Sequence, residues 1–151
     1  MMSKRKRILI LIAAVFLLVA ICVPKAPSYS VAMEANWGIA LPYKALCSQV
    51  YAKDSGPSFL GDGVRYHVFE YKYEDYIDLM FAWSAAEHET LHYASVSKAA
   101  DAWLDEIEVP EDMRPNYDAC GSWHCSKEAN NEIIFFWDSE RNLLHVVENL
   151  F

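Results

Sequence analysis

The sequence predicts an α+β fold, in which an N-terminal transmembrane helix precedes a small domain with two helices on one face of an antiparallel sheet of about four strands. Three observations support this prediction. A basic cluster precedes an apolar run at the N-terminus, and segments with strand or helix periodicity follow in the order β-β-α-α-β-β. The remainder of about 120 residues is enough for one hydrophobic core and too short for two.

The N-terminal segment predicts a membrane anchor. Residues 1–7 include the basic cluster Lys4–Arg7, and residues 8–23 carry no charge. A helix of that length spans roughly 24 Å, and the flanking bases can cover the rest of a ~30 Å hydrocarbon core. We therefore expect an uncleaved signal-anchor that crosses the cell membrane once. The positive-inside rule keeps the basic tail cytoplasmic and makes the C-terminal domain extracytoplasmic.

Two alternatives to an uncleaved anchor stay open. A signal peptidase would accept the small residues between Ser28 and Ala32, and Cys22 would suit a lipoprotein, although the residue before it is larger than expected. In the anchored form, residues 24–35 contain Pro and Ser and are expected to form a stalk. The folded domain would then occupy residues 36–151.

The first half of the domain predicts two strands. Leu46–Ala52 alternates loosely and fits either a strand or a short helix. Asp54–Gly63 is rich in Gly, Pro, Ser and Asp, which predicts a loop. Val64–Lys72 alternates apolar and aromatic residues on both sides, which predicts a strand.

Two helices and a hairpin complete the expected order. Acids at Glu74 and Asp75 favour the start of one helix, and Ser97–Ile107 fits a second helix with Ser97 as its N-cap. Pro110 begins a stretch that we expect to be irregular to about Asn131. The segments Glu132–Trp137 and Leu143–Val147, joined by Asp138–Asn142, predict a β-hairpin whose first strand is central because it is apolar on both faces.

The charge is divided unevenly along the chain. Residues 26–151 hold eight of the 13 bases and all 21 acids, which gives a formal charge of −13. Such a domain cannot neutralise phosphates, so a nucleic-acid partner is excluded, and anionic lipid surfaces repel it. The six acids from Asp101 to Asp112 fit a solvated helix face and its exit. The composition therefore favours a neutral or basic protein partner, or a cation.

The sequence HETLH at 88–92 matches the motif H-E-x-x-H. On a helix, His88 and His92 lie on one face and could both bind zinc as metal ligands, with Glu89 as the catalytic general base. In this respect the segment resembles the zincin metallopeptidases over about ten residues. The metzincin third ligand is missing, because position 98 is Lys98. The alternative is that both histidines flank the core of a helix and that no cofactor is bound.

The cysteines leave several readings open. Cys120 and Cys125 lie five apart in a segment expected to be loop-like, so outside the cytoplasm they could close a small disulfide. They could equally stay as thiols, or bind metal together with His124. Cys47 has no obvious partner in the sequence.

Residues 37–72 and 132–151 resemble small, uncharacterised membrane-anchored or secreted envelope proteins of Gram-positive bacteria. The resemblance rests on WGIALP at 37–42, on LGDG at 60–63 before an aromatic strand, and on the closing hairpin with Asp138, Asn142 and LLHVVE at 143–148. It implies a cell-envelope location and a role without catalysis. We therefore expect an extracytoplasmic binding or accessory domain of the immunity type. The alternative function is a small zinc metallopeptidase that uses His88, Glu89 and His92.

Overall fold

The computed structural model describes residues 29–42, 46–56, 62–73, 75, 77, 92–93, 96–127 and 130–151. The chain divides into two units, 1–38 and 39–151, and each is described by itself. The first unit contributes helix α2 (Tyr29–Trp37), which overlaps the predicted stalk. Its end is explained by Gly38, which has a φ of 70° and whose N–H donates to the carbonyl of Glu34 at 2.8 Å.

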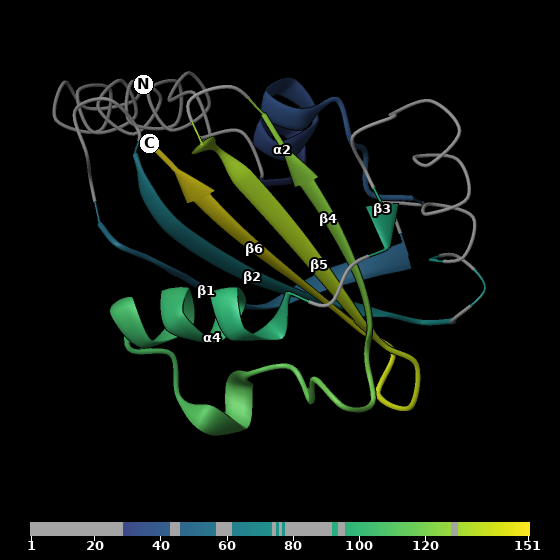
Figure 1. Cartoon of the computed structure of the whole chain (residues 1–151). Coiled ribbons are helices and arrows are strands. Elements are labelled where there is room, and N and C mark those ends of the chain that lie inside the picture. The colour runs from purple at the N-terminus through teal and green to yellow at the C-terminus, as the bar shows by residue number, and fades with distance from the viewer. Residues whose placement is uncertain are drawn as a thin grey trace, which may run out of the picture. The chain divides into compact units, whose positions relative to one another are not determined.

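The second unit is built on a six-stranded sheet in which every neighbouring pair is antiparallel (Figure 1). The spatial order of the strands is β1-β2-β6-β5-β4-β3. The strands are β1 (Cys47–Asp54), β2 (Gly63–Tyr71), β3 (His92–Tyr93), β4 (Gly121–Ser126), β5 (Glu132–Asp138) and β6 (Leu143–Leu150). The C-terminal strand β6 lies between β2 and β5, so residues far apart in sequence meet in the centre.

The predicted fold is wrong in the number and order of its strands. The expected order is β-β-α-α-β-β with about four strands, whereas the described residues contain six strands, three of which precede α4 (Ser97–Glu106). Strand β4 was predicted to be irregular, because its sequence GSWHCS mixes small polar residues with one aromatic. Strand β3 has only two residues, which is too short for any periodicity to show.

The predicted helices have different outcomes. Helix α4 matches the predicted second helix, although its N-cap is Val96 and no side chain caps it, so Ser97 does not have the predicted role. Of the first predicted helix, Asp75 and Ile77 are helical. The predicted transmembrane segment at 8–23 lies outside the described residues. Within the described ranges, no helix is long and apolar enough to cross a membrane.

The predicted C-terminal hairpin is confirmed. Strands β5 and β6 pair from Glu132 with Asn149 to Asp138 with Leu143, and β5 is central, between β6 and β4. Asp138 closes the turn, because its carboxylate accepts the backbone N–H of Arg141 at 2.9 Å and the Nε–H of the same arginine at 2.6 Å. Asn142 takes a φ of 54°, a left-handed conformation that asparagine tolerates well.

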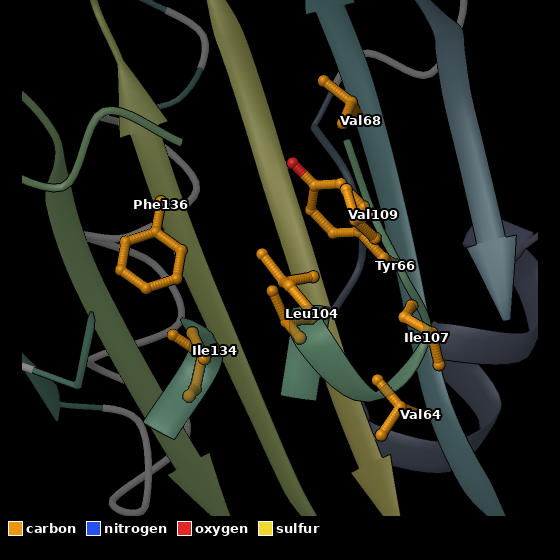
Figure 2. Close-up of a cluster of buried hydrophobic side chains, with 10 residues drawn as sticks. Val64, Tyr66, Val68, Leu104, Ile107, Val109, Ile134 and Phe136 are labelled. Carbon is orange, nitrogen blue, oxygen red and sulfur yellow. The ribbon is translucent and has the colours of Figure 1, made fainter. Parts of the chain in front are cut away.

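One face of the sheet is covered by α4 and the residues that follow it. Figure 2 shows Leu104, Ile107 and Val109 directed at side chains of β2 and β5. The buried cluster comprises Val64, Tyr66, Val68, Ala100, Leu104, Ile107, Val109, Ile134, Phe136 and Val147. Its members alternate along each strand, so the period-2 pattern of the sequence selects this face.

The opposite face of the central strands is buried as well. Phe69 and Tyr71 of β2, Phe135 of β5 and Val146 of β6 are at most 5% exposed. Tyr71 also meets Trp137 edge to face, with ring centroids 6.1 Å apart. Side chains on both faces of the sheet's centre are therefore buried.

Candidate functional site

The segment that follows α4 builds the wall of a groove. The chain reverses at Glu108, which has a φ of 54°, and the N–H of Val109 returns to the carbonyl of Leu104 at 2.9 Å. Ile107 and Val109 are buried in the core cluster, which fixes the start of the wall. The 3₁₀ helix η2 (Glu111–Met113) then carries acidic side chains outward. The groove wall is defined here as residues 107–120.

Arg114 ties this wall to the helix. Its Nε and Nη2 both donate to the carbonyl oxygen of Val109, at 3.0 and 2.9 Å. Its Nη1 bridges Oδ1 of Asp101, at 2.9 Å, and Oδ1 of Asp105, at 2.7 Å. Burial alone would lower the pKa of this guanidinium, but the two carboxylates outweigh burial and raise the pKa, so Arg114 stays charged.

Tyr117 joins the same network from the far end of the wall. Its hydroxyl donates to Oδ1 of Asp101 at 3.2 Å, and its ring meets Phe136 edge to face with centroids 5.2 Å apart. Burial, followed by the charge of Asp101, raises the pKa of the Tyr117 phenol. The group therefore remains a neutral hydrogen-bond donor at ordinary pH. It connects the groove to the apolar core below it.

Between α4, the wall and the β5–β6 turn lies an open, polar groove of about 860 Å³. It is lined by Ser97, Asp101, Asp105, Glu111, Asp112, Arg114, Pro115, Asn116, Tyr117, Asp118 and Arg141. Five carboxylates face two guanidinium groups, one of which is held by Asp101 and Asp105 and the other by Asp138. The groove is therefore negatively charged, and the side chains of Glu111, Asp112 and Asp118 are exposed.

A buried polar bridge lies beneath the wall. The hydroxyl of Tyr66 is 2.6 Å from the carbonyl oxygen of Met113 and 2.6 Å from Nδ1 of His145. A carbonyl can only accept, and the hydroxyl has one proton, so Tyr66 donates to Met113 and accepts from Nδ1–H of His145. In Figure 2 the ring of Tyr66 reaches from β2 across β6. The bridge thus connects two strands of the sheet to η2.

His145 is neutral in this setting. The imidazole is 1% exposed, and its Nε2 is a buried nitrogen without a hydrogen-bond partner among the described residues. Burial, assisted by the charge of Arg141, lowers the pKa of His145 to about 4. The carboxylate of Asp138 opposes this shift but does not cancel it. Above that pH the ring holds a single proton, on Nδ1.

The zinc-site prediction is only partly covered by the structure. His88 and Glu89 lie outside the described residues, whereas His92 lies in strand β3 and pairs with His124 of β4. A helix that continues through His92 is therefore wrong, which removes the helical basis for placing both histidines on one face. Throughout the described ranges, no three His, Cys, Asp or Glu side chains converge on a metal position. The peptidase alternative stays a prediction that zinc stoichiometry would test.

Of the open alternatives for Cys120 and Cys125, the extended strand β4 favours thiols over a disulfide. Cys120 and Cys125 are present as reduced thiols. Cys120 immediately precedes β4 and Cys125 lies within it, so five steps along extended chain separate them by roughly 16 Å and point them to opposite faces. A disulfide needs Cα atoms within about 7 Å. Burial raises the pKa of the Cys120 thiol to about 11, so it is a poor nucleophile.

Sequence reasoning missed the groove because its lining comes from separate segments. The acids from Asp101 to Asp112 were interpreted as a solvated helix face, and Arg114, Tyr117 and Arg141 were not singled out. The one available signal was the position of Arg114, a lone base directly after six acids. Only the fold shows that this base turns back onto Asp101.

Comparisons with protein-family models, with curated proteins and with solved structures find no match. The function is therefore argued from the site. The lining of the groove contains no histidine or cysteine. Five of its polar side chains are carboxylates, which suit the binding of cationic groups.

Proposed function

We propose that the C-terminal domain is a protein-binding module whose groove takes a basic segment of a partner. The observation that carries this proposal is the charge of the lining. Asp101 and Asp105 share one guanidinium, and the exposed carboxylates of Glu111, Asp112 and Asp118 have no ion-pair partner in the part of the chain that the structure describes. Lysine or arginine side chains of a partner would supply the missing positive charge.

The hydrogen-bond geometry leaves room for such a ligand. Arg114 and Tyr117 both use Oδ1 of Asp101, and Arg114 uses Oδ1 of Asp105, so the Oδ2 atoms of the two aspartates are not engaged in these bonds. An incoming guanidinium can therefore bind these atoms without displacing Arg114. Met113, which is 42% exposed, adds an apolar contact next to the acids. Arginine and lysine stems make use of such contacts.

The net charge of the whole segment 26–151 indicates the kind of partner. Residues 26–151, with a formal charge of −13, repel nucleic acid and anionic lipid and attract basic protein surfaces. The basic cluster followed by an apolar run at the N-terminus supports a location at the cell membrane with the domain on the extracytoplasmic side. We propose an accessory or immunity-like role there, in which the domain captures a basic envelope protein.

A defined peptide tests the groove. A fluorescein-labelled peptide of alternating arginine and glycine should bind the full chain in anisotropy titrations, and a glutamate–glycine peptide should not. The double variant Glu111→Gln with Asp112→Asn should weaken binding about fivefold, because each exposed ion pair contributes less than about 1 kcal/mol.

The matched control is Glu70→Gln with Glu106→Gln, which removes the same charge from two exposed residues that do not line the groove. It should change the affinity by less than a factor of two. If both double variants weaken binding equally, the peptide is responding to net charge and the groove is not the site. If neither peptide binds, the proposed function is wrong.

A further inference from the structure

We propose that His145 is an acid-sensitive latch on the groove wall, whose protonation releases the part of the wall from η2 to Cys120 from the sheet and opens the groove. The proposal rests on the buried bridge from His145 through Tyr66 to Met113. It goes beyond the proposed function, because it concerns the conformation of the wall whether or not a ligand is bound.

The bridge is a buried polar contact between the sheet and η2, whereas the contact of Lys53 in β1 with the carbonyl of Glu108 is exposed and lies at the start of the wall. Tyr66 donates to the carbonyl of Met113, in the last residue of η2, and the direction of that bond is set by His145, which donates to the same hydroxyl. The rings of Tyr66 and His145 also lie nearly parallel, at an interplanar angle of 13°. The side chain that holds η2 is thus oriented by an imidazole on the central strand.

A second N–H on this imidazole would have no hydrogen-bond acceptor. Nδ1 already donates to Tyr66, so protonation would add a donor at Nε2, which is buried and has no acceptor in the described structure. A buried charge without a hydrogen-bond partner is strongly unfavourable. The protonated ring must therefore gain access to water through a movement of its surroundings.

The wall is the element that can move at least cost. His145 lies on β6, which is hydrogen-bonded on one side to β2, opposite Val68, and on the other to β5, opposite Phe136. Moving this strand would break the centre of the sheet. The segment from η2 to Cys120 consists of one short 3₁₀ helix, turns and irregular chain, and its contacts with the core cluster are those of the half-buried Tyr117 and Cys120. Opening it therefore costs less than separating the central strands.

The groups around the latch set its response to pH. Asp138 of β5 favours the protonated ring, Arg141 of the β5–β6 turn opposes it, and burial opposes it most strongly. Tyr117 and Cys120 of the wall face Tyr66 rather than His145, and burial raises the pKa of each. The carboxylates Asp101 and Asp105 at Arg114 are a second acid-sensitive contact of the wall. The test must therefore separate His145 from them.

Amide hydrogen exchange of the full chain, without any ligand, measures the opening of the wall directly. From η2 to Cys120, four amides of the wall have internal acceptors: Met113 to Pro110, Arg114 to Glu111, and both Ala119 and Cys120 to Asn116. After correction for intrinsic exchange rates, their protection should fall at least tenfold from pH 6.5 to pH 4. Amides of β5 and β6 should keep their protection over the same range.

His145→Gln should abolish most of this pH dependence, because glutamine does not gain a charge. The matched control is His67→Gln, on the opposite face of the sheet, where burial likewise lowers the histidine pKa to about 4. That variant should keep the tenfold fall. Equal pH dependence in wild type and His145→Gln would overturn the proposal, because the fall would then come from Asp101 and Asp105.

A second variant covers the case in which His145→Gln does not fold. Tyr66→Phe removes only the bridging hydroxyl, so the wall amides should lose protection at pH 6.5 as well as at pH 4. An unchanged wall in Tyr66→Phe would also overturn the latch. Binding of the arginine–glycine peptide at pH 7 is measured separately, so a failure of the latch and a failure of the groove are told apart.

Discussion

The centre of the sheet and the groove wall are held by different forces. In β5 and β6, nearly every side chain is buried, and the backbone is bonded on both sides. In the wall, residues 107–120, apolar burial anchors the start at Ile107 and Val109, and the ring of Tyr117 packs against Phe136. Polar contacts hold the rest, from Arg114, from Tyr66 at Met113 and from Lys53 at Glu108.

Because of this difference, the centre of the sheet provides stability, and the groove wall responds to pH and salt. Burial of apolar area does not titrate and is not screened by ions, whereas ion pairs are weakened by salt and the histidine bridge depends on pH. The protein can therefore alter the surface that binds a partner without unfolding the sheet beneath it. Substitutions in the centre of the sheet and substitutions in the wall should therefore have different effects.

The largest effect is expected in the apolar region. Leu104 of α4 is fully buried in the cluster that joins the helix to β2 and β5. Leu104→Ala should lower the free energy of unfolding by about 2–5 kcal/mol, because it removes buried methyl groups and leaves a cavity. Urea unfolding followed by circular dichroism measures this loss.

Lys98→Ala provides the control on the same helix, because Lys98 is exposed. It should change stability by less than about 0.5 kcal/mol. A loss below 1 kcal/mol in Leu104→Ala would show that α4 does not stabilise the sheet, and the comparison drawn above would fail.

The next effect is the pH dependence of stability. The pKa of His145 is about 4 in the folded chain, against an ordinary value of 6.5, so the unfolded chain binds more protons between these values. Its contribution is complete above pH 6.5, is lost as the pH falls, and levels off below pH 4. The loss should be of the order of 3 kcal/mol.

Urea unfolding at pH 7, 5 and 4 measures this loss. His145→Gln should remove a large part of the dependence of the unfolding free energy on pH. His67, whose pKa is lowered in the same direction, should contribute a smaller part because it is less buried. A slope that is unchanged in His145→Gln would show that the imidazole is not held neutral by the fold.

The sequence predicts the apolar region much better than the wall. The alternation at 64–72, the helical stripe in Ser97–Ile107 and the apolar run Ile133–Trp137 each report a local period, and the elements they predict are present. The sequence of the groove wall has no hydrophobic period of a strand or a helix. Arg114 reaches Asp101 across 13 residues and Tyr66 reaches Met113 across 47, so these contacts exist only once the chain has folded.

Strand β4 shows the same limit within the sheet. Its sequence alternates weakly, with Ser122 and Cys125 buried and Trp123 and His124 partly exposed. Pairing with the strongly apolar β5 determines that this segment is extended. Tertiary pairing thus overrides a weak local signal, which is why the predicted strand number was wrong.

A smaller effect is expected when the arginine of the wall is replaced. Arg114→Gln removes the fork on the carbonyl of Val109 and the bridge to Asp101 and Asp105, and should cost about 1.5–3 kcal/mol. Arg114→Lys is the matched variant, because it keeps the charge and loses the planar fork. If lysine restores full stability in urea unfolding, charge alone holds the wall and the fork is unimportant.

The smallest effect concerns single carboxylates on the rim of the groove. Glu111 is exposed and has no ion-pair partner among the described residues, so Glu111→Gln should leave the free energy of unfolding within about 0.5 kcal/mol of wild type. Its effect should appear in binding, where one exposed pair with a basic peptide contributes about 0.2–1 kcal/mol at low salt. Raising the ionic strength from 0.02 to about 0.5 M should erase the difference in peptide affinity between wild type and Glu111→Gln, because the Debye length shrinks to a few ångströms. A difference that persists at high salt would mean that Glu111 makes a desolvated contact, and that the wall closes over its ligand instead of meeting it at the surface.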